Sequence, residues 1–166
     1  MSNALFVIDQ SLIDFLESPV AILVASRDEG NRPVITRGFG ARVSDDCSQV
    51  TVFVTEKQSA AVLRDIEQSQ IVVFTAANIT NYESYQLKGN NAYLVDLSIK
   101  DERYISQYLE TFQLEMTKVG VTPKQAAAMF QSRNNENIVG IKFTTQEIYC
   151  QTPGPGAGKP REQDTK

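Results

Sequence analysis

The sequence predicts an α+β protein built on a six-stranded antiparallel β-barrel with flanking helices. Short runs of β-branched and aromatic residues alternate with turn residues over most of the first hundred positions, and after Ser98 the hydrophobic period changes from two to near four. The 166 residues, 42% of them hydrophobic, suffice for one core. We expect a single domain over residues 1–152 and a Pro/Gly-rich C-terminal tail over residues 153–166.

The first elements are a helix and a hairpin. Apolar residues recur at helical spacing from about Ala4 to Glu17, and Pro19 stops the pattern. The turn "RDEGNRP" then separates two apolar runs, which predicts two paired strands. The six expected strands cover residues 20–26, 34–43, 50–54, 70–77, 85–98 and 137–151.

Three further helices are expected between the later strands. One covers residues 59–69, and a long one follows Ser98, which with Asp101 makes an N-cap pair, and ends at Gly120. The next begins at Thr122, since "TPKQ" combines a cap, a first-turn proline and a capping-box glutamine.

Composition restricts the chemistry. There is no histidine and no tryptophan, which excludes histidine-based triads and most catalytic zinc sites, and no metal site is expected. A formal net charge of -4 argues against nucleic acid and anionic membrane surfaces as partners. Without a leader-like N-terminus or a long apolar run, we expect a cytoplasmic protein with small-molecule or protein partners.

The polar run "TEKQS" stands where a strand ends and a helix begins. A helix N-terminus offers free N–H groups to an anion, and Thr55, Lys57 and Ser59 add two hydroxyls and a charge. The alternative is that Ser59 only caps its helix and Lys57 only solvates a loop.

Two other strands carry candidate binding residues. Arg37 is followed by Gly38 and Phe39, and glycines in this strand mark either a bend of the barrel or a close approach by another group; the arginine could equally be a surface ion-pair partner. In "YESYQLKG", alternation places Gln86 and Lys88 on one face, opposite the packed residues.

The order of these pieces resembles the FMN-binding split barrel of the pyridoxamine 5'-phosphate oxidase family, over roughly residues 18–97. The resemblance implies that Arg37, Thr55 and Ser59, with Gly38 and Phe39 beside them, surround the FMN phosphate. Ala61 stands where the oxidase has a lysine, so Lys57 would supply that charge. A bound flavin would need a cationic or N–H donor near its N1/O2 edge, and strand alternation alone makes Gln86 and Lys88 the candidates.

The resemblance further implies a homodimer with the flavin in its seam, and the aromatic residues of the later helices are candidates for that interface or for ordinary core. This chain lacks the tryptophan and histidine of the oxidase. The expected function is therefore that of an FMN-binding oxidoreductase of unknown substrate, not the vitamin oxidase, with a small-molecule electron donor and acceptor. The tail, "TPGPGAG", is either frayed or an arm across the partner. The alternatives are a deazaflavin in place of FMN, or a non-catalytic dimeric module that binds another phosphate-bearing ligand or haem, or acts through protein contacts.

Overall fold

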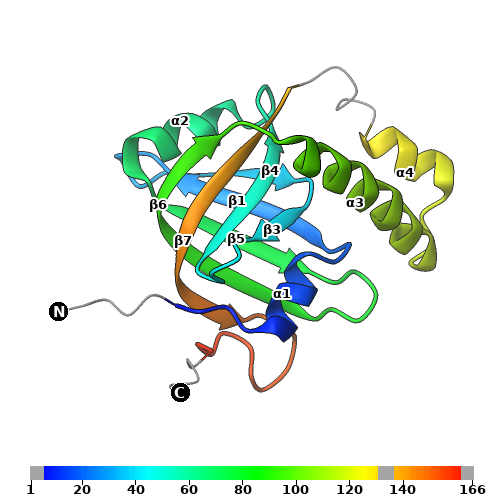
Figure 1. Cartoon of the computed structure of the whole chain (residues 1–166). Helices are drawn as coiled ribbons and strands as arrows, with labels where there is room; N and C mark the ends of the chain where they lie inside the picture. Colours follow the sequence, from blue (N-terminus) through cyan, green and yellow to red (C-terminus); the bar gives the residue numbers. More distant parts are fainter. Residues whose placement is uncertain (1–5, 131–136, 162–166) are drawn as a thin grey trace.

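The computed structural model describes residues 6–130 and 137–161 and contains one curled seven-stranded sheet with helices around it (Figure 1). The strands are β1 (Ala21–Arg27), β2 (Pro33–Gly38), β3 (Ala41–Val43), β4 (Gln49–Thr55), β5 (Val72–Ala77), β6 (Ser84–Val95) and β7 (Ile138–Cys150). The helices are α1 (Gln10–Leu16), α2 (Ala60–Ser69), α3 (Ile99–Lys118) and α4 (Pro123–Phe130).

The strands follow the order β2-β1-β5-β6-β7-β4-β3, and every pair is antiparallel. The two ends of this order are consecutive in the chain, so the sheet curls until they meet. The Phe39 N–H donates to the Phe53 carbonyl at 2.7 Å, and the Phe53 N–H donates to the Gly40 carbonyl at 3.1 Å. These two bonds close the barrel.

The predicted α+β barrel is confirmed, with seven strands instead of six. The predicted strand over residues 34–43 is divided into β2 and β3, because the chain turns a corner at Gly40, whose φ of 98° favours glycine. Tyr104 packs 2.7 Å from where a Cβ of Gly40 would lie. The glycine therefore marks a barrel bend. The other five predicted strands are confirmed to within a few residues.

The helices confirm most of the end signals read from the sequence. Ser98 and Asp101 form the expected reciprocal capping box of α3, and the Thr122 N–H donates to Gln125 Oε1 at 2.9 Å before α4. The predicted start of the first helix was wrong, because α1 begins at Gln10. Asp9 caps it by accepting a hydrogen bond from the Leu12 N–H at 3.0 Å. Residues 1–5 lie outside the described residues.

Alternation along the strands separates an interior from an exterior face of the barrel. The interior is filled by large side chains such as Phe74, Leu87 and Phe143, all fully buried. Figure 1 shows α2 at one end of the curled sheet, α1 at the other, and α3 and α4 along one side. The aromatic residues of the long helix, Tyr108 and Phe112, are buried, which makes them core rather than surface.

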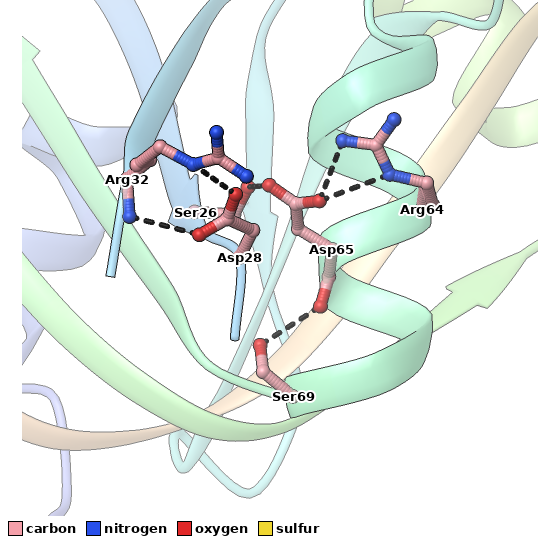
Figure 2. A network of polar contacts seen from close by, with 6 residues as sticks. All are labelled: Ser26, Asp28, Arg32, Arg64, Asp65 and Ser69. Atoms are coloured by element: carbon pink, nitrogen blue, oxygen red, sulfur yellow. Dashed lines mark hydrogen bonds and ion pairs between the residues drawn. The ribbon is translucent and has the colours of Figure 1, made fainter. Parts of the chain in front are cut away.

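The end of the barrel under α2 is fixed by a buried carboxylate, drawn in Figure 2. Asp65 accepts hydrogen bonds from Ser26 Oγ of β1 at 3.3 Å and from Arg64, whose Nη2 lies 3.0 Å away. Its side chain is wholly buried, whereas that of Arg64 is mostly exposed. A second pair, Asp28 and Arg32, ties the turn between β1 and β2 at 2.8 Å. The bond between Ser26 and Asp65 thus fixes α2 against β1, and the pair of Asp28 and Arg32 fixes the turn of the hairpin.

The described part of the tail folds back on its own chain. The Gly158 N–H donates to the Cys150 carbonyl at 2.7 Å, and the Arg161 N–H donates to the Ile148 carbonyl at 2.7 Å. Arg161 Nη2 also lies 2.6 Å from Asp9 Oδ2, which ties the tail to the cap of α1. Residues 158–161 thus lie along β7, Arg161 reaches the cap of α1, and residues 162–166 lie outside the described residues.

Candidate functional site

The predicted site residues do not share one face of the sheet, but a cross-strand row on the exterior face connects two of them, Arg37 and Gln86. The register pairs Arg37 with Leu23, Leu23 with Thr75, Thr75 with Gln86, and Gln86 with Tyr149. Directly paired residues point to the same face, so these five side chains form one line over five strands. We call this line the Arg37 row. With neighbouring strands about 4.8 Å apart, Arg37 and Gln86 are separated by roughly 14 Å.

Arg37 is held by two aromatic rings at the end of the row. Its Cζ lies 4.9 Å from the ring centroid of Phe130 in α4 and 5.7 Å from that of Phe112 in α3. Its guanidinium forms no ion pair or hydrogen bond with any residue in 6–130 or 137–161. A half-buried positive charge with no carboxylate beside it is suited to receiving an anion.

The charge of Arg37 acts on the neighbouring phenol of Tyr108. Burial raises the pKa of Tyr108, and the positive charge of Arg37 opposes that rise. The phenol donates to the Val20 carbonyl at 2.6 Å. The charge of Arg37 therefore acts on the aromatic side chains between the sheet and α3.

Ser59 lies on the other face of β2 from Arg37. Its Oγ is 2.8 Å from Thr36 Oγ1, and both side chains are buried. Because Thr36 and Arg37 are consecutive in a strand, they point to opposite faces. The structure therefore places the Ser59 and Arg37 side chains on opposite faces of β2, and Ser59 can donate to a phosphate only where Thr36 is the donor of their shared hydrogen bond.

Thr55 and Lys57 lie beside an acidic cleft. Thr55 is buried, its hydroxyl has no hydrogen-bond partner among the described residues, and it is paired with Ile138. Lys57 is exposed in the turn that follows. The neighbouring cleft, of about 600 Å³, has Leu97, Ile105, Ser106, Asn137 and Ile138 on its walls and three carboxylates, those of Glu56, Asp96 and Glu102. Neither Thr55 nor Lys57 lines this cleft, although Glu56 between them does.

Gly38 and Phe39 serve the packing of the barrel. A Cβ on Gly38 would lie 2.4 Å from Ile22 Cγ2, so the close approach that this glycine permits is that of a β1 side chain. The Phe39 ring packs edge-on against Phe130 at 6.2 Å. Phe39 thus supports the ring that covers Arg37.

Gln86 and Lys88 lie on the exterior face of β6, as alternation predicts. Gln86 is half-buried, in the Arg37 row. The Lys88 ammonium is 3.3 Å from Glu147 Oε2 and 4.6 Å from the ring centroid of Tyr149. The hydrogen bond with Glu147 raises the pKa of Lys88, so this group stays positive at neutral pH. Both residues remain accessible from solvent.

The sequence reasoning missed Leu23 and Thr75, which form the middle of the row, and the two rings that hold Arg37. A signal for the first existed: the hairpin turn fixes the register of β1 and β2, which pairs Leu23 with Arg37. No local signal connects Arg37 to Phe112 or Phe130, which come from distant helices.

The described part of the chain has neither a metal-binding group nor a membrane-spanning helix. No group of three or more histidine, cysteine, aspartate or glutamate residues could hold a metal ion there. Within the same residues, no helix has the length and apolar character needed to cross a bilayer.

Comparison with solved structures identifies the fold. HupZ of Group A Streptococcus is 18% identical, with a TM-score of 0.54 over 91% of this chain and 99% of HupZ. An F420 reductase is 12% identical, with a TM-score of 0.51 over 85% of this chain and 98% of its own. An FMN-binding protein of Syntrophomonas wolfei is 11% identical, with a TM-score of 0.52 over 86% of this chain and 87% of its own.

No protein-family model and no curated protein sequence matches this chain. The similarity is therefore one of architecture, and it extends over nearly the whole length of each neighbour. The curled antiparallel sheet, closed at Phe39 and Phe53, is the part of this chain that carries the architecture. The chain has the split-barrel fold of the pyridoxamine 5'-phosphate oxidase-like proteins.

Proposed function

We propose that this protein binds FMN along the Arg37 row and acts as a flavin-dependent oxidoreductase. The observation that carries the proposal is the composition of the row: a guanidinium with no acidic partner among the described residues at one end, Leu23 and Thr75 next, and then the Gln86 amide, with the Lys88 ammonium two residues further along β6. The presence of an F420 reductase and an FMN-binding protein among the structural neighbours supports a flavin-like ligand.

The residues of the row fit the parts of FMN. Arg37 can donate two parallel N–H groups to a phosphate, and Leu23 offers an apolar surface to the ring system. Gln86 and Lys88 offer donors to the N1/O2 edge. A five-carbon chain that joins a phosphate to a tricyclic ring can bridge the roughly 14 Å from Arg37 to Gln86. In this arrangement Arg37 is the main phosphate ligand, and Thr55, Lys57 and Ser59 contribute only after rearrangement.

Because the chain has no histidine, we assign the reactive group to the cofactor and the binding and orientation of the cofactor to the protein. Bound FMN supplies the redox chemistry, since its N5 takes or gives a hydride without a protein nucleophile. The Lys88 ammonium, which is paired with Glu147 at 3.3 Å, would offer positive charge to the pyrimidine edge of the ring, and Gln86 would orient that edge by donating a hydrogen bond. The donor and acceptor are small molecules that reach the exposed face of the sheet.

The visible absorption spectrum of the purified protein, before and after FMN is added and the sample desalted, tests the proposal. We expect flavin bands at about one FMN per chain, because the charge of Arg37 lacks any other described partner. Oxidation of NADH or NADPH by the loaded protein, with oxygen or a quinone as acceptor, then measures turnover.

The outcomes separate the proposal from its alternatives. A protein that retains no FMN contradicts it, and the same desalting assay with haem or pyridoxal phosphate then tests a module for another ligand. A protein that retains FMN but oxidises no nicotinamide, with any acceptor, supports a non-catalytic flavin carrier.

We also propose that the protein is a homodimer that pairs through the exterior face of β1 and β2. Ile35 and Leu23 are 64% and 46% exposed there, and the register places Ala25 directly beside Ile35. Among the described residues, no helix covers the side chains of Ile35 and Leu23, and burying them against a second copy would remove apolar surface from water.

Ile35→Asp is expected to convert the dimer to a monomer, because a carboxylate buried in an apolar interface is unfavourable by several kcal/mol, and Ile35 lies outside the Arg37 row. Light scattering after size-exclusion chromatography measures the change. Ile99→Asp is the matched control, since Ile99 is 70% exposed on α3, and it should leave the mass unchanged. A wild-type protein that is monomeric at micromolar concentration contradicts the dimer.

A further inference from the structure

The guanidinium of Arg37 lies between the sheet and two rings of the helical layer. We infer that Phe130 and Phe112 are positioning residues for Arg37, which hold its guanidinium ready for the phosphate of a ligand and so make the site selective for phosphorylated flavins. The inference rests on the proposed function and assigns to α3 and α4 a role in it. The observations that carry it are the two cation–π distances, 4.9 Å and 5.7 Å.

The two rings are themselves fixed by other rings. Phe130 packs edge-on against Phe112 at 6.1 Å and against Phe39 at 6.2 Å. Phe112 in turn is stacked on Tyr108, with 5.6 Å between the centroids and 7° between the planes. All of these side chains are buried. A ring that is packed on several sides cannot move together with the guanidinium. The rings therefore fix the position of the guanidinium.

This arrangement leaves the hydrogen-bonding capacity of Arg37 unused. An aromatic ring contacts a guanidinium on the flat face of the guanidinium, whereas the N–H donors of the guanidinium point outward in its plane. Those donors have no acceptor among the described residues. An arginine immobilised without loss of its donors loses little further conformational entropy when it binds a phosphate.

The helix α4 packs through two buried residues. Only Ala126 and Phe130 are buried among its eight residues. Ala126 lies one turn before Phe130, so the buried stripe of α4 ends on the ring that covers Arg37. Phe112 and Phe39 hold this end of α4 in place, so the guanidinium lies against a ring that is already fixed.

The ratio of the dissociation constants for riboflavin and FMN, measured by fluorescence quenching, isolates the phosphate contact. We expect the wild-type protein to prefer FMN, and Phe130→Leu to reduce that preference by roughly threefold to tenfold through a weaker affinity for FMN. Phe112→Leu, at the longer distance, should reduce it less. Phe130→Tyr keeps the ring and should restore the preference.

Phe53→Leu is the matched control. Phe53 is buried on the same side of the barrel, where it packs against Tyr104 at 6.0 Å, but it does not contact Arg37. The control should lose stability without a change in the ratio. A structural role of Phe130 would change both dissociation constants together and so overturn the inference.

Two further results separate this inference from the proposed function. A wild-type preference for FMN that Phe130→Leu leaves unchanged supports the proposed function and overturns the inference. A rise in FMN affinity in Phe130→Leu also overturns it, since the ring would then cover Arg37 against the ligand. A wild-type protein that binds neither flavin contradicts the proposed function, and the inference falls with it.

Discussion

Arg37→Ala is expected to weaken FMN binding about 100-fold, because a charge-assisted, bidentate contact with the phosphate is lost. The free energy of unfolding should change by no more than about 1 kcal/mol, since Arg37 has no ion pair to lose among the described residues and its contacts with the two rings are replaced by water. Titration of the apoprotein with FMN, followed by urea denaturation, measures both quantities. Riboflavin affinity should remain close to that of the wild type.

Two substitutions make this result specific. Arg32→Ala removes an arginine of the neighbouring turn that is 85% exposed and paired with Asp28, and it should leave FMN affinity unchanged. Arg37→Lys keeps the charge but loses the planar donor pair and the stacking, so we expect only partial recovery. Equal FMN affinities in wild type and Arg37→Ala would place the phosphate elsewhere.

Gly89→Ala is expected to reduce the free energy of unfolding by about 3 kcal/mol, the upper end of the range for overpacking a core. A Cβ at this position of β6 would lie 2.2 Å from Cδ2 of Phe143. That ring cannot withdraw easily, because it is fully buried and packs against Phe74 at 6.2 Å. Urea denaturation at one fixed protein concentration measures the change and keeps any dimer contribution constant.

The control for this substitution is another glycine. Gly156, in the C-terminal segment, has no described atom within 4 Å of the position that a Cβ would take, and Gly156→Ala should change stability by less than about 0.5 kcal/mol. Gly89→Ala combined with Phe143→Leu should recover part of the loss, since the smaller side chain makes room. A Gly89→Ala protein as stable as the wild type would mean that the ring relocates without penalty.

The order of elements could be predicted from the sequence because each depends on local signals. Strand alternation and the capping boxes at Ser98 and Thr122 depend on neighbouring residues alone, and all of them are confirmed. The division of the second predicted strand was missed because it depends on closure, a contact between Phe39 and the distant Phe53. The glycines of this run indicate a bend, but they give no sign that the strand changes its partner there.

The site was less predictable, for a related reason. Alternation placed Gln86 and Lys88 correctly on one face of β6. The same rule, applied to Thr36 and Arg37, would have shown that a serine bonded to Thr36 cannot meet Arg37 on one face. The bond between Ser59 and Thr36 is a tertiary contact, as are the contacts of the two rings with Arg37. No spacing in the sequence encodes these contacts.

The position of β7 in the sheet has a consequence for how the chain folds. β7 is the last strand of the sequence, yet it lies between β6 and β4, so Thr55 of β4 pairs with Ile138 across about half of the chain. Until the ribosome has released this strand, β4 and β6 each present an unpaired edge of backbone donors and acceptors. The nascent chain must therefore keep its apolar strands from associating with other chains until β7 emerges, and we expect the non-local pairing of β4 with β7 to be a slow step of folding.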